Sequence, residues 1–211
     1  MTFTPVDLFG AMVAESLERN SGSSPFFQRD LNSLHVGEGE IVLGGTPEKA
    51  LEQWAPQGRL PLLYLGGEAG GALAWSELLG ENRLTAVGAT CFDADQARRL
   101  RSSQRFLPLT DVGFSVALQT ALSELGAEEF AVSLNLNLFS KDTHLNIPEG
   151  SFRGLQPGNF LACLDSTLSG FVSRYHIWGS FYQRSGPNDL AVALGAEVTR
   201  EILLAWWRRE E

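Results

Sequence analysis

Residues 130–139 read FAVSLNLNLF, and this stretch predicts a buried strand over residues 130–138. Successive side chains of a strand point to opposite faces, so Ser133, Asn135 and Asn137 would share one face and the leucines the other. A buried strand of a parallel sheet is usually apolar on both faces. The two amides therefore indicate a polar site at the end of this strand, or the remains of one.

Working outward from this strand, candidate strands and helices alternate along the chain. Further strands are expected over residues 40–43, 60–65, 84–87 and 174–181. Helices are expected over residues 4–19, 46–54, 72–79, 113–125, 156–169 and 189–208, with polar loops over 94–108 and 140–154. This alternation predicts one α/β domain over residues 1–211, a three-layer α/β/α fold with a mostly parallel sheet. Binding sites of such folds lie at the carboxyl ends of the strands.

The composition limits the classes of molecule that this protein is expected to bind. The chain has 211 residues and a net charge of −9, with a pI near 4.9, so its surface repels nucleic acid and anionic membranes. The N-terminus lacks the basic and apolar regions of a secretory signal. Cys91 and Cys163 lie far apart and form no metal-type spacing, which favours a reducing cytoplasm.

Three predicted strand ends carry polar or glycine-rich motifs in a recognisable order. They read Gly66-Gly67-Glu68-Ala69, then Asp93-Ala94-Asp95-Gln96-Ala97, then Ser133-Leu134-Asn135-Leu136-Asn137. In this order they resemble the ureohydrolase superfamily (arginase, agmatinase and formiminoglutamase), whose motifs are Gly-Gly-Asp-His, Asp-Ala-His-x-Asp and Ser-x-Asp-x-Asp. The resemblance covers roughly residues 36–208, is nearest to the formiminoglutamase branch and implies an arginase-like fold that is truncated or divergent over residues 1–35.

The resemblance also implies a site for two manganese ions, which the family holds with two histidines and four aspartates. Position by position, these six ligands fall on Ala69, Asp93, Asp95, Ala97, Asn135 and Asn137. Only Asp93 is unchanged, and the two alanines have no ligand atom. Two neighbouring divalent ions need several carboxylates to offset their repulsion, whereas amide oxygens supply no charge.

The leading hypothesis is therefore a non-catalytic ureohydrolase-fold protein without the dinuclear manganese site, which acts in binding, scaffolding or regulation. The alternative is a hydrolase of C–N bonds in formiminoglutamate-, agmatine- or arginine-like compounds. It would use one divalent cation held by Asp93 and Asp95, or no metal, with Glu68 and His144 lining the pocket. Expected partners are a small-molecule ligand, a second copy of the chain or another protein.

Other motifs have simpler interpretations that compete with a functional one. Asn135 and Asn137 are expected to hydrogen-bond neighbouring loops, because buried amides need partners. The glycine loop at residues 66–71 could cradle a phosphate, but it lacks a Walker lysine. The arginines at positions 98, 99, 101 and 105 either bind an anion or form surface ion pairs, and surface pairing is favoured.

Overall fold

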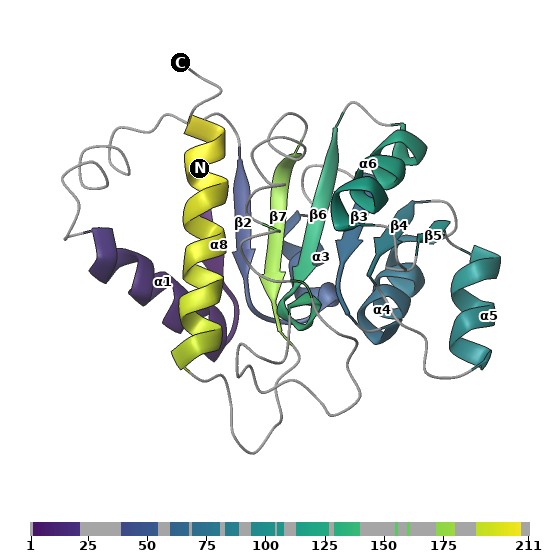
Figure 1. The fold of residues 1–211 in the computed structure, drawn as a ribbon. Coiled ribbons are helices and arrows are strands. Elements are labelled where there is room, and N and C mark those ends of the chain that lie inside the picture. Colours follow the sequence, from purple (N-terminus) through teal and green to yellow (C-terminus); the bar gives the residue numbers. More distant parts are fainter. Residues whose placement is uncertain are drawn as a thin grey trace.

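A computed structural model of the protein describes residues 2–21, 39–54, 60–67, 69–80, 83–88, 94–103, 105–107, 113–126, 129–139, 155, 160, 172–179 and 189–207. Seven strands in these ranges form one sheet (Figure 1). They are β1 (Thr2–Pro5), β2 (Glu40–Leu43), β3 (Leu62–Leu65), β4 (Leu84–Val87), β5 (Arg105–Leu107), β6 (Phe130–Asn135) and β7 (Val172–Trp178). Their order is β1-β2-β7-β6-β3-β4-β5, and every pair is parallel.

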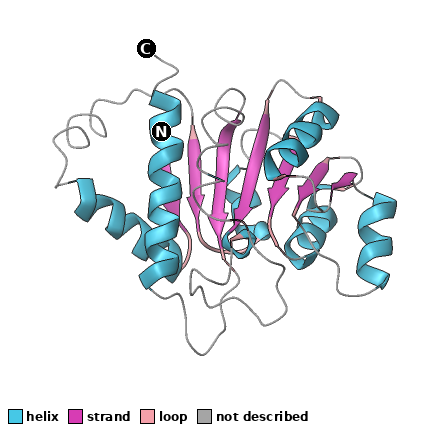
Figure 2. Ribbon diagram, in the orientation of Figure 1, coloured by secondary structure: helices cyan, strands magenta, loops and turns pink. Residues whose placement is uncertain are grey.

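Helices cover both faces of this sheet, as Figure 2 shows. They are α1 (Leu8–Ser21), α3 (Pro47–Trp54), α4 (Ala69–Leu79), α5 (Ala94–Ser103), α6 (Phe114–Leu125) and α8 (Asp189–Trp207). One apolar core contains side chains of α1, α6 and α8, and a second contains side chains of α3 and α4. Helix α5 packs against α4 and β5, at the end of the sheet. The predicted three-layer α/β/α architecture is confirmed.

The two cores follow from strand alternation. In β3, Leu63 and Leu65 belong to the core under α1, α6 and α8, whereas Leu62 and Tyr64 belong to the core under α3 and α4. All four residues of β3 and all four of β4 are buried. Strands buried on both faces are typical of a parallel sheet covered by helices.

The N-terminal segment differs from its prediction. Thr4 and Pro5, expected to open a helix, end strand β1 instead, and α1 begins three residues later. Proline is tolerated here because β1 is the edge strand of the sheet. Asp7 caps α1: its Oδ1 accepts the Gly10 N–H at 2.8 Å and its Oδ2 accepts the Gly45 N–H at 2.7 Å.

The expected polar loop over residues 94–108 is also wrong, because helix α5 and strand β5 occupy most of it. Asp95 lies in the first turn of α5 and pairs with Arg98 at 3.1 Å, and Arg99 pairs with Glu77 of α4. All four of these side chains are more than half exposed. The favoured interpretation of Arg98 and Arg99 as partners in surface ion pairs is thus confirmed, whereas the side chains of Arg101 and Arg105 are not among those described.

Strand β6 is shorter than predicted. It ends at Asn135, and Leu136–Leu138 form a 3₁₀ turn. Ser133 and Asn135 remain on one face of the strand, but Asn137 belongs to the turn. The predicted face of three polar side chains is therefore wrong for its third member.

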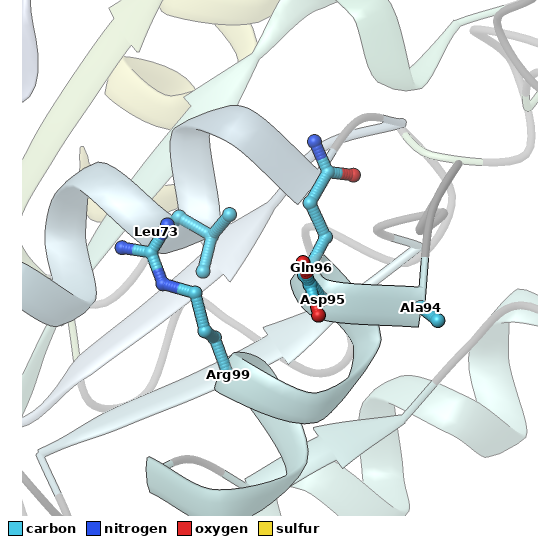
Figure 3. Close-up of a pocket in the computed structure, with 5 residues that line it drawn as sticks. All are labelled: Leu73, Ala94, Asp95, Gln96 and Arg99. Carbon is cyan, nitrogen blue, oxygen red and sulfur yellow. The ribbon is translucent and has the colours of Figure 1, made fainter.

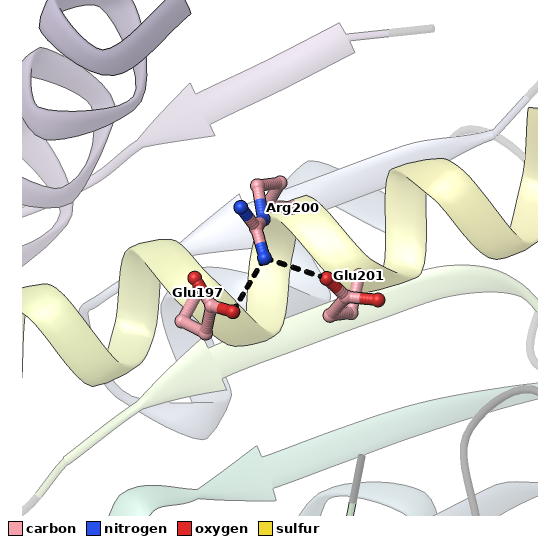
Figure 4. A network of polar contacts seen from close by, with 3 residues as sticks. All are labelled: Glu197, Arg200 and Glu201. Atoms are coloured by element: carbon pink, nitrogen blue, oxygen red, sulfur yellow. Dashed lines mark hydrogen bonds and ion pairs between the residues drawn. The ribbon is translucent and has the colours of Figure 1, made fainter. Parts of the chain in front are cut away.

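The other predicted elements lie at or near their expected positions, although α4 begins three residues early and β7 ends at Trp178. The helix expected over residues 156–169 lies largely outside the described residues, as do both cysteines. Helix α8 carries a group of charged side chains, in which Arg200 Nη2 lies 2.5 Å from Glu197 Oε1 and 2.8 Å from Glu201 Oε1 (Figure 4). In the part of the chain that the structure describes, no helix is long and apolar enough to cross a membrane.

Candidate functional site at the carboxyl edge of the sheet

The carboxyl ends of β3 and β6 lie side by side in the middle of the sheet. From β3 the chain continues to β4 on one side, and from β6 it continues to β7 on the opposite side. Ligands of open α/β folds bind at the carboxyl edge where the strand order reverses in this way. The first and third sequence motifs, at residues 66–69 and 133–137, flank this point.

One amide side chain, that of Asn137, ties the ends of these strands together, and a second, that of Asn135, fixes the turn that carries it. The Gly67 N–H donates to Asn137 Oδ1 at 2.9 Å, and the Asn137 N–H donates to Asn135 Oδ1 at 3.0 Å. Both asparagines are at most 2% exposed. The backbones are also in close contact, since a Cβ on Gly67 would lie 2.3 Å from the Asn137 carbonyl oxygen. The expectation that these amides hydrogen-bond neighbouring loops is confirmed for Asn137, whereas the Asn135 contact lies within its own segment.

One atom of this arrangement has no partner. Among the described residues, Asn137 Nδ2 is buried and makes no hydrogen bond. A buried donor without an acceptor costs on the order of 1–3 kcal/mol, so such atoms are rare in folded proteins. The atom sits on the same amide that accepts the Gly67 N–H, just before the N-terminus of α4.

The other candidate residues do not all lie at the carboxyl ends of β3 and β6. Ala69 is buried in the first turn of α4, where it packs in the core under α3 and α4. The side chain of Asp95 is 80% exposed and paired with Arg98. Ala97 lies within α5. Glu68, Asp93 and His144 lie outside the described residues.

Asp95 lines an open groove between α4 and α5 (Figure 3). The groove has a volume of about 410 Å³ and is also lined by Leu73, Ala94, Gln96 and Arg99. Leu73 is the buried member of this lining. The polar side chains of the lining are exposed or half-buried, so the groove is solvated rather than a closed pocket.

A buried polar network centres on Ser133, the first residue of the third motif, and the sequence did not predict its other members. Ser133 Oγ accepts the indole N–H of Trp75 at 2.9 Å and that of Trp178 at 3.0 Å, and it lies 3.2 Å from His176 Nδ1. His176 Nε2 lies 3.0 Å from the Gly44 carbonyl oxygen. Ser133 and His176 are both 0% exposed. The signal in the sequence was weak, because Ser133 and His176 lie in predicted strands that contain other polar residues.

The protonation of this network follows from its geometry. Burial lowers the pKa of His176 to about 3, against a smaller opposing effect of the Gly44 carbonyl, so the ring is neutral near pH 7. The Gly44 carbonyl only accepts, so Nε2 carries the proton and Nδ1 accepts the Ser133 hydroxyl. The hydroxyl oxygen then has both lone pairs occupied by the two indoles. Ser133 is thus fully bonded and sealed, and it cannot serve as a nucleophile.

Aromatic stacking closes the network. The His176 and Trp178 rings stack at 5.4 Å with an interplanar angle of 3°, and the Trp54 and Trp75 rings stack at 5.7 Å with an angle of 13°. His176 also meets Trp75 edge to face at 5.9 Å. The four rings join β7, α3 and α4 on one face of the sheet.

Comparisons with known proteins show which solved structures have a similar fold. No protein-family model and no curated protein matches the sequence. Among solved structures, an arginase from Bacillus subtilis matches with a TM-score of 0.63 and 12% identity, over 93% of this chain and 78% of that one. A formimidoylglutamase from Bacillus subtilis matches with a TM-score of 0.63 and 12% identity, over 79% of this chain and 60% of that one.

A proclavaminate amidino hydrolase from Streptomyces clavuligerus matches with a TM-score of 0.62 and 13% identity, over 81% of this chain and 65% of that one. The chain thus spans less than two thirds of the length of this protein and of the formimidoylglutamase. The resemblance that the three motifs predicted is confirmed for the fold. The chain has an arginase-like α/β fold.

Proposed function

We propose that this protein is a non-catalytic member of the ureohydrolase fold, which uses the carboxyl edge of its sheet for binding rather than for metal-dependent hydrolysis. One observation carries the proposal: the oxygens of Asn135 and Asn137 both accept backbone N–H groups. At these two positions the family pattern places metal-binding aspartates, and here the same oxygens hold the protein backbone together.

The chemistry of the described side chains supports this proposal. Two amides, the methyl group of Ala69 and the exposed carboxylate of Asp95 form a poor ligand set for two manganese ions. The amides supply no negative charge to offset the repulsion between two divalent ions. The amide oxygens of Asn135 and Asn137 each already accept a backbone N–H, which leaves one lone pair on each oxygen.

The decisive experiment measures metal content and activity on the same samples. The purified chain is incubated with manganese, passed through gel filtration and analysed by mass spectrometry for bound metal. It is then assayed for hydrolysis of formiminoglutamate, agmatine and arginine. We expect neither stoichiometric manganese nor turnover, and two tightly bound manganese ions per chain would overturn the proposal.

The alternative, a hydrolase that uses one cation on Asp93 and Asp95, is tested by Asp93→Ala and by Asp95→Asn. If wild-type turnover with an added divalent cation is lost in both variants, this alternative replaces the first proposal. Asp95→Asn has a matched control in Gln119→Glu, which also alters a single exposed side-chain amide or acid, on α6. A cytoplasmic location and self-association or a protein partner complete the proposal, and gel filtration with light scattering tests self-association.

A further inference from the structure

A small cavity lies at the amino edge of the sheet, on the face covered by α3 and α4. Its lining includes Leu62, the first residue of β3, and Trp54 and Leu79, the last residues of α3 and α4. Ala131 of β6 and Arg174 of β7 also line it. The cavity has a volume of about 10 Å³. One water molecule needs about 10–15 Å³ of room, so the cavity fits a ligand of one heavy atom.

Two lining side chains are buried and can only donate hydrogen bonds. Trp54 is 4% exposed, and its Nε1 has no hydrogen-bond partner among the described residues. Arg174 is 6% exposed, and its guanidinium carries N–H donors and no acceptor. The other described side chains of the lining are apolar, apart from the indole of Trp75, which donates to Ser133. A ligand of this cavity must therefore accept hydrogen bonds.

The charges around the cavity favour a neutral acceptor. The register of β2 and β7 aligns Glu40 with Arg174. Burial raises the pKa of Glu40, and the positive charge of Arg174 opposes this rise, so the two charges act on each other. The guanidinium thus has a carboxylate nearby and needs no further anion. A water oxygen is neutral and has two lone pairs, enough to accept from an indole and a guanidinium together.

We infer that the cavity lined by Trp54 and Arg174 binds one ordered water molecule, which accepts hydrogen bonds from Trp54 Nε1 and from the Arg174 guanidinium. This water would join the end of α3 to β7. The Trp54 ring stacks on Trp75 and meets His176 edge to face at 6.3 Å, so the water also fixes an indole that packs against the buried network. The site goes beyond the proposed function, because it lies at the opposite edge of the sheet.

The first test detects the water at the indole of Trp54. Its Nε1–H signal is assigned by its absence from the ¹H–¹⁵N spectrum of Trp54→Phe. In the wild type we expect cross-peaks from this proton to the water resonance in both laboratory-frame and rotating-frame Overhauser spectra. A bound water gives cross-peaks of opposite sign in the two experiments, whereas hydrogen exchange gives the same sign in both. Absence of the cross-peaks, or a pure exchange pattern, overturns the inference.

The second test fills the cavity with Ala131→Val, whose two added methyl groups take the room of one water molecule. We expect the cross-peaks of Trp54 to be lost, while the indole signals of Trp75 and Trp178, which donate to Ser133, persist as internal controls. Unchanged Trp54 cross-peaks in the folded variant overturn the site. If Ala131→Val fails to fold, the wild-type spectra and a crystal structure decide.

The crystal structure of the wild type, grown with sodium bromide, separates water from a halide. We expect a water peak within hydrogen-bonding distance of Trp54 Nε1, without anomalous signal. An anomalous bromide peak there, or no density in the cavity, overturns the inference. None of these results bears on manganese content or turnover, so their failure leaves the proposed function standing.

Discussion

The substitution Ser133→Ala tests the view that the buried network fixes the strands beneath the carboxyl edge. It removes one hydroxyl, yet it deprives three buried groups of their partner: the indole N–H of Trp75, that of Trp178, and Nδ1 of His176. Each buried polar group left unsatisfied costs on the order of 1–3 kcal/mol. The vacated space is no larger than a hydroxyl, so no water enters to replace it. We expect a loss of about 3 kcal/mol or more in the free energy of unfolding.

Urea denaturation measures this loss, with far-UV circular dichroism as the main probe because the substitution alters the surroundings of two tryptophans. The matched control is Ser115→Ala on α6, an exposed serine that should change stability by less than about 0.5 kcal/mol. A double-mutant cycle with His176→Phe should show coupling, because the two side chains share a network. A loss below about 1 kcal/mol in Ser133→Ala, with an unchanged denaturant slope, would refute the reasoning.

Three further predictions address acid stability, helix capping and the strand-end contact. The pKa of His176 is about 3 in the folded protein against 6.5 for the free side chain, so the unfolded chain binds the extra proton below pH 6.5. The contribution of His176 to the free energy of unfolding is fully present above pH 6.5 and falls by about 1.4 kcal/mol per pH unit towards pH 3. Urea denaturation of His176→Phe at several pH values should lack this part of the pH dependence. Asp7→Ala removes the cap of α1 and the bond to the Gly45 N–H, so it should lower the free energy of unfolding by about 1–2 kcal/mol, with Asp7→Asn retaining part of it. Gly67→Ala places a methyl group 2.3 Å from the Asn137 carbonyl oxygen and should lower the free energy of unfolding by about 1–3 kcal/mol. The control Gly70→Ala has open space around its Cβ and should stabilise α4 by about 0.5–1 kcal/mol. Comparable melting temperatures for the two variants would contradict the close approach of Gly67 to Asn137.

The elements that were predictable from sequence are those whose signals are local. Residues 47–54 begin with proline at the first helical position, and α6 ends at Gly126, whose φ of +59° is the left-handed conformation that glycine favours. Strands β2 and β4 are short apolar runs with turn residues beside them. In each case the residue pattern and the final environment agree, so no tertiary information was needed.

The misplaced elements have competing local and tertiary causes. The alternation of leucine and asparagine over residues 134–138 fits a strand, but Asn135 captures the N–H two residues ahead and turns the chain into a 3₁₀ turn. Residues 94–103 read as a polar loop because they lack an apolar stripe. They form a helix in which Asp95 and Arg98, three residues apart, pair on its surface. Pairing with β2 draws the N-terminal segment into the sheet.

The sequence predicted that the first and third motifs lie together, but it did not predict which of their polar atoms would be hydrogen-bonded. Motif order brought residues 66–69 and 133–137 to the same edge, and the parallel register of β3 and β6 places them together. Which amide atom would remain free depends on the contact between Asn137 and Gly67, 70 residues apart in the chain. The network of Ser133, His176 and Trp178 depends likewise on the register of β6 against β7, which aligns Ser133 with His176.

The inner and outer polar clusters are both hydrogen-bonded in most of their groups. In the inner cluster the described contacts match every donor and acceptor of Ser133 and His176, whereas Nε1 of Trp54, which stacks on Trp75, has no partner among the described residues. In the outer cluster Asn137 joins the two strand ends and Asn135 fixes the turn, and Asn137 Nδ2 has no partner among the described residues. Evolution towards stability alone would favour a side chain there that leaves nothing unsatisfied, since a buried orphan donor is costly. Trp54 Nε1 and Arg200 Nε are also buried donors without a partner among the described residues, so an unmatched donor at the strand end does not by itself distinguish a binding site from the remnant of one.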